Sequence, residues 1–455
     1  MESSFHKRPF YVLAAFEAAA CLGGIVLARQ TGGDAALPAP ELAGGAVVVT
    51  LLTLTTLLAV GCYDWRRAAD LREVAVRLVA GVGLALIGIA VIAYLPGAPS
   101  IPPAWALVWL AAVLPAILAI RWLFLSIVDM DRFKARVLVL GAGEHARTLA
   151  DLEAAAKRVP FRIVGFVSGG EPSLRVSAGR VWDAAGDLAA RIRTAEIDEV
   201  VVALDDRRGQ LPTDELIAVR LMGISVTDYQ TYCERILGRV DLDALRPSWF
   251  LFDAGFRCGR LDCWLKDAFD LGVSALLLLV FAPVMLATAV AVRLDSPGPA
   301  LFRQERVGKG GHRFDLLKFR SMGVDAESVG APQWAQTNDP RVTRVGAFIR
   351  KVRIDEMPQL FNVLRREMSI VGPRPERPEF VEMLNEEISF YQERHAMKPG
   401  ITGWAQLNYP YGASVTDARR KLEFDLYYVK NFSILFDTLI LVQTVGVVLW
   451  NEGAR

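Results

Sequence analysis

Four long apolar stretches dominate the first third of the chain and constrain its fold more than any other feature. They are residues 10–27, 44–61, 78–94 and 105–128. Each approaches the ~20 residues that a helix needs to cross the hydrocarbon of a membrane. A cleavable signal peptide would account for the first stretch only. The sequence therefore predicts an α-helical membrane bundle with four spans over residues 1–130.

The distribution of basic residues orients this bundle. They gather before the first stretch, between the second and third, and after the fourth: Lys7, Arg8, Arg66, Arg67, Arg72, Arg77, Arg132, Lys134 and Arg136. The other two loops, 30–43 and 95–103, contain no Lys or Arg. The positive-inside rule then places both ends of the bundle in the cytoplasm. Arg121, near the cytoplasmic end of the fourth stretch, is interpreted as snorkelling toward the headgroups, with a site inside the membrane as the alternative.

Residues 131–250 have the pattern of a cytoplasmic α/β domain. Short apolar runs at 136–140, 161–167, 199–204 and 224–226 indicate buried strands, with helical patterns between them. Strands that alternate with helices favour a parallel, Rossmann-like sheet.

A glycine-containing turn follows the first of these strands. The spacing of Gly141, Gly143 and Ala146 would let a helix N-terminus meet a phosphate. The acidic residue that binds a ribose about 20 positions later is missing, because the second strand ends Phe166-Val167-Ser168. We therefore expect a degenerate nucleotide-binding domain without a cofactor, with a bound dinucleotide as the alternative.

A further apolar segment, 271–292, is also long enough to span the membrane. A fifth crossing would put everything after it outside the cell, yet both flanks are basic: Arg257, Arg260 and Lys266 precede it, and Arg293, Arg303 and Arg306 follow it. Pro283 lies near its middle, where it removes a helix hydrogen bond. The sequence predicts a re-entrant helix-hairpin that breaks at Pro283, with a kinked spanning helix as the alternative.

The rest of the chain is cationic and rich in motifs, in the stretches 302–308, 314–322, 337–344, 350–360, 371–376 and 398–404. An acidic pair, Asp355-Glu356, lies among Arg350, Arg353 and Arg374. Arginine forks match the oxygens of a pyrophosphate, and a carboxylate among them can hold Mg²⁺. An isolated Asp-Glu pair is usually a solvated helix face, and an isolated arginine can anchor to anionic lipid. Only the combination of these residues points to phosphate chemistry.

With these motifs in this order, residues 264–447 closely resemble the catalytic core of the bacterial monotopic sugar transferases, which transfer hexose 1-phosphates to polyprenyl phosphate. The bundle followed by a Rossmann-like domain resembles the long form of that family. One departure is Ala282 before Pro283, where the family usually has a serine. The resemblance implies a mostly α catalytic domain over 251–455, on the cytoplasmic face of the bacterial inner membrane.

The same resemblance implies the chemistry. Asp355 would attack the β-phosphorus of a UDP-hexose, release UMP and form a covalent aspartyl phospho-sugar, with Asp355 also as a ligand of Mg²⁺. Glu356 would deprotonate undecaprenyl phosphate, which then accepts the phospho-sugar in the first membrane step of exopolysaccharide, O-antigen or capsule assembly. Arg350 and Arg374 match the family's phosphate-contacting arginines. Arg353, Lys318 and Arg320 are further candidates by charge and position.

Two other functions stay open at this point. One is an NAD-linked sugar-modifying enzyme, although no Tyr-x-x-x-Lys pair occurs in residues 136–237. The other is a membrane-anchored scaffold that binds nucleotide sugars. Membrane lipids are expected partners and a homodimer is possible, whereas a net charge of +1 gives no reason to expect nucleic acid. The sequence does not determine which hexose is used. The apolar stretch 433–450 is expected to be an interfacial or core helix.

Overall fold

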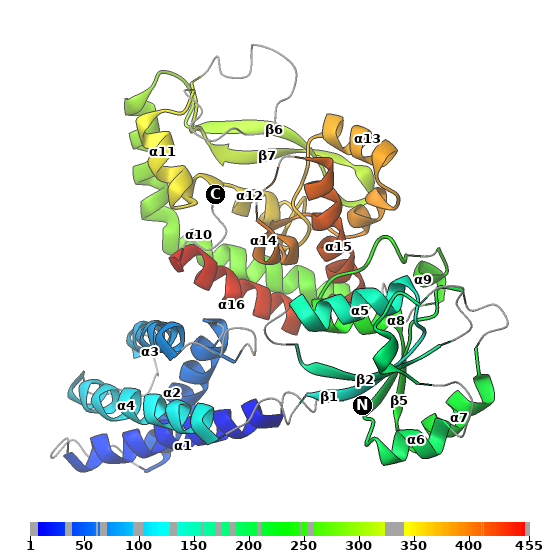
Figure 1. Ribbon diagram of the computed structural model, residues 1–455. Helices are drawn as coiled ribbons and strands as arrows, with labels where there is room; N and C mark the ends of the chain where they lie inside the picture. Colours follow the sequence, from blue (N-terminus) through cyan, green and yellow to red (C-terminus); the bar gives the residue numbers. More distant parts are fainter. Residues whose placement is uncertain are drawn as a thin grey trace. The chain divides into compact units, whose positions relative to one another are not determined.

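The computed structural model describes residues 8–31, 39–60, 62–63, 71–93, 103–127, 134–155, 159–168, 174–182, 188–206, 211–245, 247–252, 259–323, 341–410, 412 and 414–450. Lys7, Arg66, Arg67, Arg132, Arg257 and residues 337–340 of one motif lie outside the described residues. The chain divides into two compact units, Met1–Ile236 and Leu237–Arg455. The first contains a helical bundle and an α/β domain (Figure 1). The second contains the acidic pair.

The bundle consists of α1 (Arg8–Thr31), α2 (Ala39–Ala59), α3 (Leu71–Ala93) and α4 (Pro103–Ile127). Apolar side chains from all four helices, including Cys21, Leu57, Val82 and Val113, are buried between them. Among the described residues of the bundle, only Tyr11–Thr31 is both long and apolar enough to cross a membrane, and the other apolar parts are shorter. The four apolar helices are confirmed, and the number of spans stays a prediction.

Arg121 does not snorkel to the surface of the bundle. Its guanidinium is buried, with Nε 2.5 Å from Oε1 of Glu17 on α1, and its NH1 group donates to the carbonyl of Cys62 at 2.7 Å. The hydroxyl of Tyr63 also donates to Glu17. The snorkelling interpretation is therefore wrong. The carboxylate of Glu17, far away in the sequence, compensates the charge of Arg121 inside the bundle, so the guanidinium does not need to reach water.

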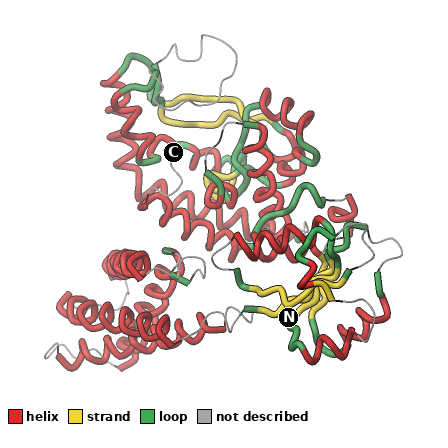
Figure 2. The backbone as a smooth tube through the Cα atoms, viewed as in Figure 1, coloured by secondary structure: helices red, strands yellow, loops and turns green. Residues whose placement is uncertain are grey.

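The α/β domain has a five-stranded parallel sheet in the order β3-β2-β1-β4-β5. Its elements are β1 (Ala135–Leu140), α5 (Glu144–Ala155), β2 (Phe161–Val167), η3 (Ala178–Arg180), β3 (Val181–Trp182), α6 (Leu188–Thr194), β4 (Glu199–Val202), α7 (Thr213–Leu221), β5 (Ser225–Asp228) and α8 (Tyr229–Leu237). This strand order matches the first five strands of the Rossmann order 3-2-1-4-5-6, so the prediction of a parallel Rossmann-like sheet is confirmed. The strands appear as one yellow layer in Figure 2.

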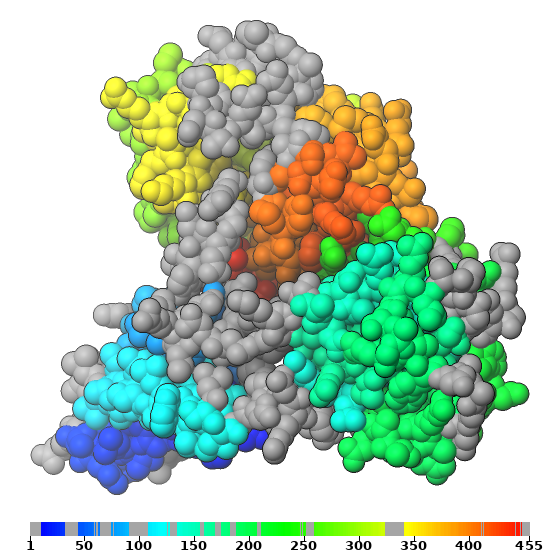
Figure 3. Space-filling view, viewed as in Figure 1, coloured from blue at the N-terminus to red at the C-terminus, as the bar shows by residue number. Residues whose placement is uncertain are grey.

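The second unit is mostly helical, with two small sheets. Its elements are α9 (Pro247–Phe252), α10 (Arg260–Asp295), β6 (Leu301–Val307), η4 (Lys309–Gly311), β7 (Arg313–Phe319), α11 (Arg344–Lys351), η6 (Ile354–Glu356), α12 (Gln359–Leu364), β8 (Ser369–Val371), α13 (Pro378–Glu387), η7 (Tyr391–Ala396), β9 (Gly400–Thr402), α14 (Trp404–Asn408), α15 (Val415–Asn431) and α16 (Ile434–Trp450). Helices α13 and α15 pack side by side, as Figure 3 shows in orange.

The second unit begins earlier in the sequence than predicted. Val240, Leu245 and Trp249 pack in the same core as Leu384 and Leu422, so the structural boundary at 236 lies before the boundary at 250 that the sequence suggested. The two boundaries differ because residues 237–250 carry no local signal that shows which core they join.

The last apolar stretch, 433–450, forms α16. This helix buries Asp437 and Ile440, so it is a core helix, which was one of the two expectations.

Helix α10 carries the apolar segment that was expected to break. It is one continuous helix of 36 residues with Pro283 inside it, and Figures 1 and 2 show that its axis changes direction part-way along. The prediction that the helix is interrupted at Pro283 is wrong. Proline removes a single backbone hydrogen bond, and the turns on both sides of Pro283 remain hydrogen-bonded, which bends a helix without ending it.

Both ends of α10 are held by the rest of the second unit. Near its start, Lys266 donates to Asp437 at 2.6 Å, and Asp270 accepts a hydrogen bond from the backbone N–H of Ile370. At its end, Asp295 accepts a hydrogen bond from the N–H of Val345 at 3.0 Å. The middle of the helix is different, because large apolar side chains such as Leu279 are exposed there.

Candidate active site

The acidic pair lies in one turn of 3-10 helix, η6, between α11 and α12. Thr343 begins α11 by accepting a hydrogen bond from the N–H of Gly346 at 2.9 Å. Arg353 follows α11 in the left-handed conformation, with φ of 59°, and turns the chain into η6. This reversal buries Asp355, which is 8% exposed, against the body of the domain.

Lys318 is brought to the pair by the strand β7. The side chain of Asn362 on α12 fixes this strand, because its Oδ1 accepts from the N–H of Leu317 at 3.0 Å and its Nδ2 donates to the carbonyl of Asp315 at 2.7 Å. Asn362 is fully buried. Asn362 therefore joins α12, which closely follows the acidic pair, to the strand that carries Lys318. The local sequence pattern around Asn362 did not predict this role.

Three cations converge on Glu356. Its Oε1 lies 2.7 Å from a terminal nitrogen of Arg374, 3.6 Å from Nζ of Lys318 and 3.7 Å from a terminal nitrogen of Arg353. The structure thus brings together Lys318, Arg353 and Arg374, three of the five residues that the sequence suggested for phosphate binding.

Asp355 is in a different situation from its neighbour. Its Oδ1 is buried and has no hydrogen-bond partner among the residues that the structure describes. Buried carboxylate oxygens are nearly always paired, so an unpaired one at this position indicates a binding or reactive group.

The two carboxylates differ in electrostatics as well. Burial and the charge of Glu356 raise the pKa of Asp355, in spite of the nearby Lys318, Arg353 and Arg350. Burial also acts to raise the pKa of Glu356, but Arg374, Lys318 and Arg353 outweigh it and hold this pKa well below its usual range. Glu356 is therefore a tightly paired anion, and Asp355 is the more basic of the two.

Arg374 lies in the loop after β8, and two observations explain its position. The buried Arg394 donates to the backbone carbonyl of Arg374 at 3.0 Å and is itself paired with Asp425 at 2.7 Å. Arg306 donates to the carbonyl of the next residue, Pro375, at 3.1 Å. These contacts fix the backbone of the loop and leave the Arg374 guanidinium directed at Glu356.

Glycines allow the motifs 371–376 and 398–404 to cross at close range. The N–H of Gly372 donates to the carbonyl of Thr402 at 2.9 Å, and that of Gly400 donates to Pro373 at 2.9 Å. A Cβ on Gly400 would lie only 2.1 Å from the nitrogen of Gly372. These glycines therefore serve backbone packing beneath the site and do not contact the carboxylates.

The structure separates the two remaining candidates. Arg350 lies in the last turn of α11, is half-buried and adds positive charge near Asp355. Arg320 is not at the acidic pair: its guanidinium donates to the carbonyls of Pro297 at 2.8 Å and Ser296 at 2.7 Å, after the end of α10. Its charge is used to bind the helix end, where carbonyl groups lack partners within the helix.

A magnesium ion fits the residues at Asp355 only in part. Mg²⁺ prefers carboxylate oxygens, phosphate oxygens and water, and the unpaired Oδ1 of Asp355 is such an oxygen. Among the described residues no group of three His, Cys, Asp or Glu side chains could hold a metal ion. The site suits an ion that is shared between Asp355 and the phosphates of a substrate, and not a site made by protein ligands alone.

The glycine turn of the α/β domain is occupied by a side chain of the domain itself. Asp205 Oδ2 accepts from the N–H of Glu144 at 2.8 Å, and Oδ1 accepts from that of His145 at 3.0 Å, at the start of α5. A Cβ on Gly143 would meet Asp205 at 2.1 Å. The carboxylate takes the position of a phosphate, so a dinucleotide would first have to displace it. This weakens the NAD-linked alternative, and the sequence analysis missed Asp205.

The chain is similar in sequence to a known family and to several known proteins. Residues 261–451 match the family described as bacterial sugar transferase. The chain is 45% identical over 235 residues to a UDP-N-acetylgalactosamine-undecaprenyl-phosphate N-acetylgalactosaminephosphotransferase of Aeromonas hydrophila, covering 52% of this chain and 55% of that protein. It is 36% identical over 342 residues to an undecaprenyl-phosphate glucose phosphotransferase of Komagataeibacter xylinus, covering 71% of this chain and 60% of that protein.

A shorter relative is covered almost completely. The exopolysaccharide production protein PSS of Rhizobium leguminosarum bv. phaseoli is 46% identical over 190 residues, which are 41% of this chain and 95% of that protein. The chain spans a little over half the length of the first two relatives. The part shared with the shorter relative is about as long as the match to the family. The family match includes the acidic pair and the three cations that surround Glu356, which are Lys318, Arg353 and Arg374.

Proposed function

Because the chain belongs to the bacterial sugar transferase family, we propose that it transfers a sugar 1-phosphate from a UDP-sugar to undecaprenyl phosphate and releases UMP. This is the proposed first membrane step in the assembly of a polysaccharide. The observation that carries the proposal is the contrast within the acidic pair. Asp355 is buried and its Oδ1 has no hydrogen-bond partner among the described residues, whereas the adjacent Glu356 is held by three cations.

The proposed first half-reaction uses Asp355 as the nucleophile. Its carboxylate oxygen forms a bond to the β-phosphorus of the UDP-sugar, and the bond from that phosphorus to the UMP oxygen breaks, so that UMP leaves with the electron pair. A buried carboxylate with a raised pKa is poorly solvated, which favours attack. The product is a covalent aspartyl phospho-sugar.

In the proposed second half-reaction, an oxygen of undecaprenyl phosphate attacks the same phosphorus and the aspartyl bond breaks. The carboxylate of Asp355 is restored and the lipid-linked sugar diphosphate is formed. Splitting one displacement into two in this way lets the same cations serve both transition states.

The cations of the site are proposed to bind the diphosphate. Arg374 and Lys318 are positioned on Glu356 by the surrounding contacts, and a diphosphate presents more negative oxygens than that one carboxylate. Arg350, whose side chain makes no hydrogen bond or ion pair among the described residues, is available to neutralise charge near Asp355. Mg²⁺, held by Asp355 and the substrate, would supply further charge neutralisation.

Glu356 is proposed to accept the proton of the acceptor phosphate. Its pKa is too low for this while three cations hold it. When the diphosphate draws Arg374 and Lys318 away, that pKa rises toward its usual range, and Glu356 becomes a better base. The proposal therefore couples base strength to substrate binding.

We further propose that α10 is a re-entrant membrane helix, with the catalytic domain in the cytoplasm. The support is that Asp270 near its start and Asp295 at its end both bond to the same folded unit, through Ile370 and Val345. One compact unit cannot lie on both sides of a membrane. The exposed apolar middle of α10 can then enter the bilayer, and the bend allows it to return.

The transfer can be tested directly with purified full-length protein. UDP-glucose, UDP-galactose, UDP-N-acetylglucosamine and UDP-N-acetylgalactosamine are each incubated with undecaprenyl phosphate and Mg²⁺, and UMP release and label in the organic phase are measured. We expect both products with at least one sugar, and neither with Asp355→Asn. UMP release with no lipid-linked product, or product that is unchanged in Asp355→Asn, would contradict the proposal.

A further inference from the structure

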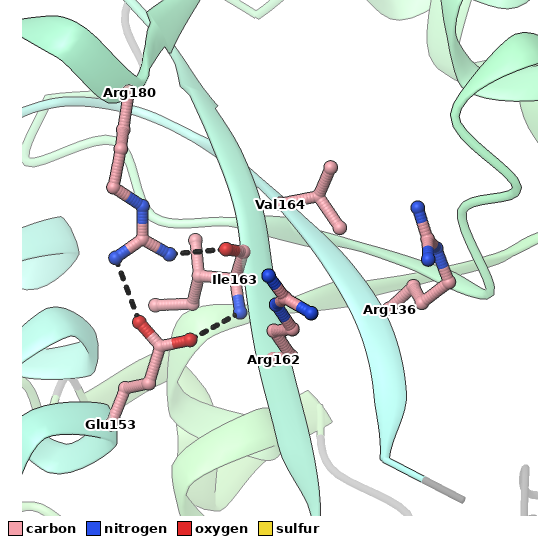
Figure 4. Close-up of a pocket in the computed structure, with 6 residues that line it drawn as sticks. All are labelled: Arg136, Glu153, Arg162, Ile163, Val164 and Arg180. Atoms are coloured by element: carbon pink, nitrogen blue, oxygen red, sulfur yellow. Dashed lines mark hydrogen bonds and ion pairs between the residues drawn. The ribbon is translucent and has the colours of Figure 1, made fainter. Parts of the chain in front are cut away.

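A cavity at the start of the parallel sheet is lined by three arginines. Arg136 on β1, Arg162 on β2 and Arg180 on η3 surround a space of about 420 Å³, together with Glu153, Ile163 and Val164 (Figure 4). This volume is within the range of small-molecule sites. The cavity lies at the opposite end of β1 from the glycine turn, because Arg136 is near the beginning of that strand and Gly141 follows its end.

Two of these arginines are direct neighbours in the sheet. Arg136 and Arg162 are paired in the register of the parallel strands β1 and β2. Side chains at paired positions of neighbouring strands lie on the same face, and like charges there destabilise a sheet. Figure 4 shows the two side chains next to one another on one side of the β2 ribbon.

The one acidic residue of the cavity does not compensate this pair. Glu153 binds Arg180 at 2.8 Å and accepts a hydrogen bond from the N–H of Ile163 at 2.7 Å. The Arg136 guanidinium donates to the carbonyl of Ala195, and the Arg162 side chain has no hydrogen bond or ion pair among the residues that the structure describes. The carboxylate of Asp198 accepts from the backbone N–H of Arg136 at 2.7 Å. Within the described part of the chain, the two adjacent guanidinium groups are therefore not paired with a carboxylate.

We infer that this cavity is a binding site for a phosphate group, between Arg136 and Arg162, distinct from the acidic pair. A phosphate accepts bidentate hydrogen bonds from guanidinium groups and would offset the repulsion between the two arginines. The phosphate can come from a soluble molecule or from an anionic lipid headgroup, since only a short segment separates the end of α4 at Ile127 from the start of β1 at Ala135.

The test uses hydrogen–deuterium exchange of full-length protein in nanodiscs, read at peptides that cover 161–167. One arm adds inorganic phosphate to phosphatidylcholine nanodiscs at constant ionic strength. The other replaces phosphatidylcholine with phosphatidylglycerol and adds no phosphate. Exchange at β2 should slow about tenfold when the phosphate is present at about ten times its Kd. A local readout is needed because the acidic-pair region also contains phosphate-binding cations.

Arg162→Gln is the diagnostic variant, because the Arg162 side chain is exposed and makes no hydrogen bond or ion pair among the described residues. It should lose the slowing, and Arg193→Gln, which removes an exposed arginine on α6 outside the cavity, should keep it. Slowing by inorganic phosphate identifies a soluble ligand, and slowing by phosphatidylglycerol alone identifies a headgroup. No slowing in either arm, equal slowing in Arg162→Gln, or equal loss in Arg193→Gln would overturn the inference.

Discussion

Arg374 binds Glu356 at 2.7 Å and leaves the adjacent carboxylate, Asp355, without a partner among the described residues. The two acids differ because η6 directs them to different surroundings. Neighbouring residues in the sequence therefore have distinct electrostatic roles.

Substituting each acid should separate the two proposed half-reactions. Glu356→Gln keeps the nucleophile, so incubation with UDP-sugar and Mg²⁺ in the absence of undecaprenyl phosphate should leave a phospho-sugar adduct on the protein. Its turnover should fall by about 10²–10⁴, the usual effect of losing a general base. Asp355→Asn should show no adduct and only background turnover. Intact-protein mass spectrometry measures both, and an adduct on Asp355→Asn would rule out the covalent mechanism.

The same two variants should change stability in opposite directions at pH 7. The pKa of Glu356 is lowered in the folded protein, so its carboxylate stabilises the fold above about pH 4.3 and that contribution is lost as pH falls. The pKa of Asp355 is raised, so its charge destabilises the fold at neutral pH and ceases to do so as pH falls. We expect Glu356→Gln to lower stability by about 1.5–3 kcal/mol and Asp355→Asn to raise it.

Thermal unfolding at pH 7 and near pH 4 measures this effect. Both differences from the unmodified protein should shrink at the lower pH, for different reasons. At Glu356 the unfolded chain begins to bind a proton while the folded protein keeps its carboxylate charged, so the stabilisation decreases. At Asp355 the folded protein binds its proton first, so the destabilisation decreases. If Glu356→Gln were as stable as the unmodified protein at pH 7, the three cations would not be contributing through Glu356.

Arg320 and Arg374 should respond differently to replacement by Gln. Arg320 binds carbonyls after the end of α10, so Arg320→Gln should lower stability by about 1–3 kcal/mol and leave kcat/KM of the folded enzyme unchanged. Arg374→Gln should reduce kcat/KM by about 10²–10³, since it removes a charged donor at the proposed phosphate site. A normal melting temperature with a raised KM in Arg320→Gln would instead restore Arg320 as a phosphate ligand.

The membrane topology of α10 can be examined by cysteine labelling. Gly308 follows β6, so a cysteine there should react with a membrane-impermeant reagent only after the cells are permeabilised. A cysteine at Gly33, in the loop that the distribution of basic residues places outside, serves as the accessible control in the same cysteine-free background. Labelling at Gly308 in intact cells with an opened outer membrane would show that α10 crosses the bilayer.

Local patterns in the sequence determined the elements of this protein. The apolar runs of β1 and β2, and the long apolar stretches of the bundle, were recognised because burial, hydropathy and helix or strand period are properties of consecutive residues. The acidic pair and its cations were found for a related reason, since charges at such density are unusual and their motifs occur in a characteristic order. Residue types were enough to suggest phosphate chemistry.

Only the tertiary structure decided which charged side chains bind one another and which bind the backbone. Glu17 and Arg121 are 104 positions apart, and Asp205 lies 61 positions after Glu144, at whose turn it accepts a hydrogen bond. Arg320 resembles Lys318 in sequence position, but one binds a helix end and the other Glu356. The physical reason is that these partners are selected by how distant segments pack, and a side chain's charge does not reveal which backbone will be folded against it.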